Sequence, residues 1–190
     1  MRPALILILT FLAGCADSTP SPAPETSSLR LATPPPVAPI AFFERACANC
    51  HGPLGMFYGD GFAQLKSDDD LIRAVRDMVT GPAQSTLDDR SLDALTAFHR
   101  WLAGKASGPF VVITTATDDT IGGECSPDTT VELILGTRTI TAATDHTAWS
   151  AQLPADWRAS PTVYLRASAA PGEPHSTIDL TRASFSHAQP

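Results

Sequence analysis

Residues Cys47-Ala48-Asn49-Cys50-His51 form a C-x-x-C-H motif, and the rest of the sequence is best interpreted outward from it. Two thiols three positions apart on one helical turn can each add to a vinyl group of haem and form two thioethers. The next residue, His51, is then placed to give its imidazole to the iron from the proximal side. The motif therefore predicts one covalently bound haem c, held by Cys47 and Cys50 and ligated by His51.

Other uses of two such cysteines are a zinc half-site and a redox dithiol. A zinc site needs a second pair of ligands, and the sequence has no second C-x-x-C. A dithiol motif needs no histidine after it and usually lies at a strand–helix–strand unit, which the surrounding sequence does not indicate. Haem attachment is the interpretation that these neighbours favour.

The stretch 42–59, FFERACANCHGPLGMFYG, resembles the first helix and haem loop of small class I cytochromes c. The resemblance continues through the helix-like runs 68–79 and 88–102 and covers about a third of the chain. It implies a small all-α cytochrome domain, which we place at residues 39–105. Phe42 and Phe43 are then expected to pack the first helix against the last. Apolar stripes support both later helices, with Leu71, Val75 and Met78 on one and Leu92, Leu95, His99 and Leu102 on the other.

The sixth iron ligand is less clearly indicated. In class I cytochromes this ligand is usually a methionine between the middle and last helices, often followed by proline, whereas here Pro82 follows Gly81. Met78 is the closest match in chain order, and Met56 lies too few residues after His51 to reach the opposite face easily. His99 is the alternative ligand, and an open or otherwise filled position is a third possibility.

Residues 1–15 have the features of an export signal: Arg2, a short apolar core and the sequence Leu12-Ala13-Gly14-Cys15. The core is too short to span a bilayer. The ending resembles the lipobox of bacterial lipoproteins, which implies lipidation of Cys15 and a permanent anchor facing the periplasm in the cell envelope. An ordinary secretory signal cut near Gly14 is the alternative. Asp17 is not directly after the cysteine, which favours the outer membrane.

Residues 16–38 are rich in Pro, Ser, Thr and Ala and have no apolar face. This composition predicts a disordered, partly polyproline tether. At ~3.1 Å per residue it could hold the next domain up to about 70 Å from the lipid.

From Phe110 the hydrophobic period changes from helical to alternating, which predicts a second, all-β domain at residues 108–190. The expected strands lie at 110–114, 131–135, 138–142, 149–153, 163–167 and 178–182. The segment 122–154 is similar to bacterial Ig-like repeats, which implies a β-sandwich with Trp149 in its core. The overall expectation is a two-domain α + β chain.

Four side chains of the expected β-domain carry chemistry that no motif explains. Cys125 remains without a role once the other cysteines are assigned, and we interpret it as a small buried apolar residue rather than a partner in an intermolecular disulfide or a metal ligand. His146, His175 and His187 fall in expected loops and ends, and we interpret them as surface residues.

The net charge of −7 and the pI near 5.0 argue against nucleic acid and anionic lipid as binding partners. A redox protein presenting a basic face is a more natural partner. The sequence thus predicts a membrane-anchored periplasmic electron carrier with one haem, and not an enzyme unless the distal haem side is open. The alternatives are a haem protein that binds a small ligand or acts like a peroxidase, and an envelope interaction module whose β-domain carries the function.

Overall fold

A computed structural model describes residues 30–31, 36–63, 67–170, 173–180 and 185–186. The chain is a mixed α + β protein in which helices come first and antiparallel sheets follow. We call residues 39–102 the helical half and residues 111–179 the β half. In the part of the chain that the structure describes, no helix is long and apolar enough to cross a membrane.

The helical half contains three longer helices and several short turns. The longer ones are α1 (Pro39–Ala46), α4 (Asp68–Thr80) and α5 (Asp89–Leu102), and the short ones are α2 (Ala48–His51), the 3-10 turn η1 (Pro53–Gly55) and α3 (Asp60–Ala63). The expected runs 68–79 and 88–102 are therefore helical nearly throughout.

Side-chain caps fix where α4 and α5 begin. Ser67 accepts a hydrogen bond from the Asp70 backbone N–H, and Asp88 accepts one from that of Ser91. Three aspartates, 68–70, follow the first cap, where negative charge suits a helix N-terminus. Gly81 ends α4, as the Gly-Pro pair at 81–82 predicts.

Aromatic packing joins α1 to α5. The rings of Phe43 and Phe98 meet edge to face at 5.5 Å between centroids, and both side chains are fully buried. Leu71, Val75 and Leu95 complete this core from α4 and α5. The expected contact between the first and last helices is confirmed, although Val79 and not Met78 is the buried end of the α4 stripe.

The strands of the β half form two four-stranded antiparallel sheets within the described residues. One sheet has the order β2-β3-β7-β6 and the other β5-β4-β8-β9. Their bounds are β2 (Val111–Ala116), β3 (Thr120–Cys125), β4 (Thr130–Leu135), β5 (Arg138–Thr141), β6 (Ala143–Asp145), β7 (Ala148–Gln152), β8 (Val163–Ser168) and β9 (His175–Asp179).

One apolar core contains side chains of both sheets. Buried and partly exposed residues alternate along β4 and β8, as expected for strands with one buried face. Trp149 is buried at the centre, which confirms its expected core position, and its indole N–H donates to the Glu124 carbonyl. Cys125 is also fully buried, and burial raises the pKa of its thiol to about 11.

The sequence analysis missed β3, because its two glycines weaken the strand signal. The backbones of β2 and β3 come so close at Gly123 that only glycine fits there. A Cβ at this position would overlap the carbonyl oxygen of Val112 on β2. The β2–β3 register shifts between Ile113 and Thr115, which marks a β-bulge next to this contact. β6 was also missed, and the last expected strand was wrong by three residues, since β9 ends at Asp179.

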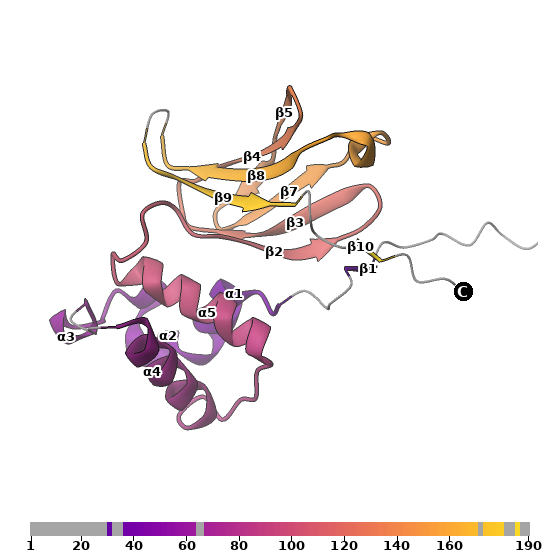
Figure 1. The fold of residues 1–190 in the computed structure, drawn as a ribbon. Helices are drawn as coiled ribbons and strands as arrows, with labels where there is room; N and C mark the ends of the chain where they lie inside the picture. The colour runs from indigo at the N-terminus through magenta and orange to yellow at the C-terminus, as the bar shows by residue number, and fades with distance from the viewer. Residues whose placement is uncertain (1–29, 32–35, 64–66, 171–172, 181–184, 187–190) are drawn as a thin grey trace, which may run out of the picture.

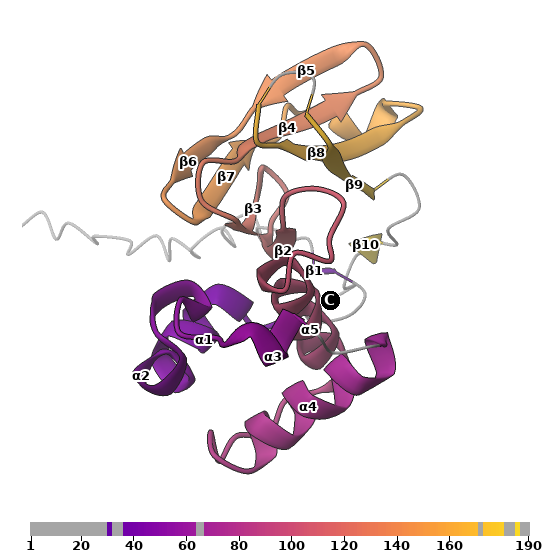
Figure 2. The same cartoon turned by 90° about the vertical axis from the view of Figure 1, so that its left-hand side faces the viewer.

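The two halves lie in layers. Helices α1 and α5 lie next to the β2–β3 edge of the first sheet, and the second sheet lies beyond it (Figures 1 and 2). Phe110, which leads into β2, is buried in the helical core with its ring 5.4 Å from Phe98. The helical core is therefore completed by a residue of the β half.

Part of the segment that we expected to be a disordered tether forms a short β-strand. Arg30–Leu31 (β1) pairs in antiparallel fashion with Phe185–Ser186 (β10). The expected signal and lipid site at Cys15 lie outside the described residues, as does His187.

Candidate functional site

The C-x-x-C-H motif lies where α1 passes into α2. The Cys47 N–H donates to the Phe43 carbonyl at 2.8 Å, and the His51 N–H donates to the Cys47 carbonyl at 3.1 Å. The two thiols and the imidazole are therefore held on consecutive turns of helical backbone. Cys47 is half-buried, Cys50 is exposed and His51 is partly exposed.

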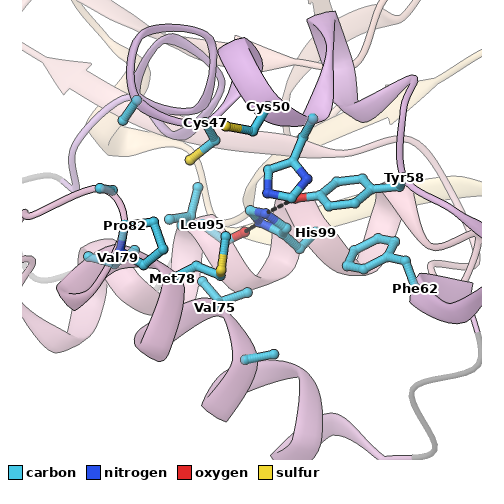
Figure 3. Close-up of a pocket in the computed structure, with 14 residues that line it drawn as sticks. Cys47, Cys50, Tyr58, Phe62, Val75, Met78, Val79, Pro82, Leu95 and His99 are labelled. Carbon is cyan, nitrogen blue, oxygen red and sulfur yellow. Dashed lines mark hydrogen bonds between the residues drawn. The ribbon is translucent and has the colours of Figure 1, made fainter.

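These three residues line one side of a mostly apolar pocket. The pocket has a cavity volume of about 170 Å³ and is open to solvent at its mouth. Its lining is Ala46, Cys47, Cys50, His51, Tyr58, Phe62, Ala74, Val75, Met78, Val79, Pro82, Ala83, Leu95 and His99. Figure 3 shows Cys47 and Cys50 facing Val75 and Met78 of α4 across the hollow.

The two possible sixth ligands from the sequence both belong to this lining. Met78 lies near the end of α4 and is 39% exposed. His99 comes from α5 and is only 6% exposed. Met56 is 68% exposed and is not part of the lining. The pocket thus brings together the motif, Met78 and His99, residues that are up to 52 positions apart.

His99 uses both ring nitrogens. Nδ1 lies 2.8 Å from the Leu95 carbonyl oxygen, and because a carbonyl only accepts, Nδ1 must carry the proton. Nε2 then accepts a hydrogen bond from the Tyr58 hydroxyl at 3.0 Å. Burial lowers the pKa of His99 to about 4, so the imidazole is neutral at physiological pH.

Tyr58 connects the two histidines, and the sequence analysis did not single it out. Its ring lies 4.5 Å from that of His51 and stacks on Phe62 at 4.0 Å between centroids. Gly55, at φ +70°, makes room for it, because a Cβ there would lie 2.5 Å from the Tyr58 ring. The sequence did show that the loop after the motif is rich in glycine and contains aromatic residues. This pattern does not indicate which aromatic ring enters the pocket.

The electrostatics of the pocket favour neutral groups. Burial, and then the neighbouring Cys50, raise the pKa of the Cys47 thiol. Burial also raises the pKa of the Tyr58 hydroxyl, so it remains a donor. Arg73 and Arg76 are exposed, and neither lines the pocket.

The donor set suits a porphyrin. Two thiols lie beside an imidazole at one wall, apolar side chains form the rest, and a thioether and a second imidazole are present. A porphyrin supplies four nitrogens of its own, so its iron needs only one or two protein ligands. In the described residues no three His, Cys, Asp or Glu side chains gather into a metal site, and His146 and His175 are exposed.

Comparison with protein-family models, with curated proteins and with solved structures found no match to this chain.

Proposed function

We propose that the chain is a c-type cytochrome that carries single electrons through one covalent haem. The observation that carries the proposal is the opening of the C-x-x-C-H motif onto a mostly apolar pocket that also contains Met78 and His99. An attachment motif at an exposed site without apolar walls would not support it.

In this proposal each residue has a defined task. Cys47 and Cys50 would hold the group through thioethers, and His51 would ligate its iron. The bound haem supplies one reversible electron, as its iron changes between the ferrous and ferric states. The apolar walls from α4 and α5 exclude water from the group, which raises its reduction potential. Cys50, exposed at the mouth, marks the edge through which a partner protein can exchange electrons.

Met78 is the sixth ligand that we favour. It is a pocket residue that stays partly exposed, so its thioether is not committed to the buried core. His99 is the alternative, but both of its ring nitrogens already make hydrogen bonds. A methionine–histidine pair suits electron transfer because it raises the potential and leaves no coordination position open.

The finer architecture and location belong to the same proposal. The helical half would be a class I cytochrome c domain, and the β half an Ig-like sandwich that supports it. A lipid on Cys15 would hold the protein at the cell envelope on the periplasmic side, with the outer membrane preferred. Its acidic surface favours a redox partner with a basic face.

The test is production of the full chain in a host with a cytochrome c maturation system. We expect a red protein whose mass is increased by one haem that survives denaturation. Replacing both Cys47 and Cys50 by serine should abolish the added mass, whereas Cys125→Ser is the matched control and should retain it. A colourless wild-type protein without added mass would refute the proposal.

The Tyr58–His99 pair favours a second function, in which the haem binds a small ligand or acts like a peroxidase. It places a phenol and a neutral imidazole in an otherwise apolar pocket, where they could contact a bound ligand. Carbon monoxide separates the two functions: rapid stoichiometric binding by the reduced protein would favour ligand binding over a pure carrier.

A further inference from the structure

Helix α1 lacks a cap of its own. Its N-cap residue, Ala38, has no side-chain oxygen, Pro39 occupies the first turn, and no acidic residue follows in that turn. The backbone N–H groups of Ile40 and Ala41 therefore need an acceptor from elsewhere. An isolated helix of eight residues is also too short to be stable in water.

The β half supplies that acceptor. The Glu124 carboxylate, near the end of β3, accepts a hydrogen bond from the Ile40 N–H at 2.6 Å and one from the Ala41 N–H at 2.9 Å. Glu124 is only 7% exposed, although it is a charged residue. A carboxylate at a helix N-terminus satisfies two free donors and interacts favourably with the helix dipole.

The same helix delivers the haem motif. α1 ends at Ala46, and the Cys47 N–H still bonds to the Phe43 carbonyl. Because α1 has only two turns, a shift at Ile40 is carried directly to the thiols. Phe110, just before β2, and the partly buried Val112 of β2 pack on the same helical core, and Val112 is paired with Glu124 in the β2–β3 ladder.

From these contacts we infer that Glu124 is a positioning residue for the C-x-x-C-H motif: the β half holds α1 and thereby sets Cys47, Cys50 and His51 against the pocket wall. The β half is then a structural part of the redox centre and not a separable docking module. The part of this inference that concerns the haem rests on the proposed function. The contact of Glu124 with the start of α1 does not depend on it.

The test compares three full-length proteins: wild type, Glu124→Gln and Glu132→Gln. Glutamine keeps the size of the side chain, but its NH₂ group cannot accept a hydrogen bond, so one helix N–H loses its partner. Glu132 is the matched control, since it lies on β4 and pairs with Arg166 away from the helices. Both variants remove one negative charge from the β half.

We expect Glu124→Gln to raise the amide hydrogen exchange of residues 40–51 by about tenfold. It should also shift the haem reduction potential and the visible spectrum. Glu132→Gln should change none of these three measurements. Unchanged exchange and potential in Glu124→Gln would overturn the inference, even if its melting temperature fell.

The two proposals fail in different ways. A wild-type protein without haem would refute the proposed function, whereas hydrogen exchange at α1 would still decide whether Glu124 holds the motif. Should Glu124→Gln not fold, Glu124→Asp gives the second variant: its shorter side chain retains the charge but cannot reach both donors. We then expect faster amide hydrogen exchange at α1 in Glu124→Asp than in wild type. Equal amide hydrogen exchange in the two proteins would overturn the inference.

Discussion

The Tyr58 hydroxyl donates a hydrogen bond to Nε2 of His99 across 3.0 Å, and this bond links the loop after the C-x-x-C-H motif to helix α5. It fixes the imidazole in one tautomer, because Nδ1–H is already used by the Leu95 carbonyl. It also holds the Tyr58 ring beside His51. The pocket wall next to the motif is therefore set by a contact 41 residues apart in the chain.

Tyr58→Phe should destabilise the protein by about 1–2 kcal/mol, because Nε2 of buried His99 loses its donor. Denaturant unfolding measures the loss. Tyr164→Phe is a suitable control, since Tyr164 lies on β8 and does not line the pocket. Equal stability of Tyr58→Phe and wild type would show that the hydroxyl bond contributes nothing.

In the proposed cytochrome, Met78→Ala should remove the methionine–iron charge-transfer band from the spectrum of the oxidised protein and lower the reduction potential, because the proposed thioether ligand would be lost. Optical titration measures both. Met56→Ala is the matched control, because Met56 is 68% exposed and lies outside the pocket lining. Survival of the band in Met78→Ala would remove Met78 from the set of ligands.

The stability of the protein should depend on pH through His99. Burial lowers the pKa of His99 to about 4, against 6.5 for an ordinary histidine, so the folded state binds fewer protons than the unfolded state between these values. The contribution of neutral His99 to the free energy of unfolding is fully present above about pH 6.5. It is lost as the pH falls to about 4, and the free energy of unfolding then decreases by up to about 3 kcal/mol.

The measurement is the free energy of unfolding of wild type relative to His99→Gln across this pH range. Because glutamine does not titrate, the difference between the two proteins reports His99 itself. His175→Gln, at an exposed position, should follow wild type. A difference that does not change with pH would contradict a neutral buried imidazole.

Gly123→Ala should destabilise the β half by about 2 kcal/mol or more, because the new methyl group would force β2 and β3 apart. Thermal unfolding followed by circular dichroism measures this. Gly59→Ala serves as the control, since nothing lies within 4 Å of a Cβ built there. A melting temperature like that of the control would mean that the bulge adapts at little cost.

Local sequence patterns predicted much of this structure. The apolar stripes placed α4 and α5 within one or two residues, because helix periodicity is encoded in neighbouring positions. The alternating runs placed β4, β5, β7 and β8 for the same reason. The motif also indicated which residues would lie at a pocket.

The contacts that shape the pocket could not be predicted in this way. Tyr58 bonds to a residue 41 positions away, and Glu124 bonds to a backbone N–H 84 positions away. Neither side chain stands out in a hydrophobic pattern, because its role depends on how distant elements pack. β3 was missed for a related reason: its glycines serve a close approach of another strand, which only the folded chain reveals.

Cys125 has a consequence for how the protein would be made. Its side chain is fully buried between the sheets, and a thiol with a pKa near 11 provides almost no thiolate at neutral pH. Once the sheets have closed, this sulfur can neither attack nor be attacked in disulfide exchange. Among the cysteines that the structure describes, a maturation enzyme would then find just Cys47 and Cys50 accessible, and it could not join either of them to Cys125.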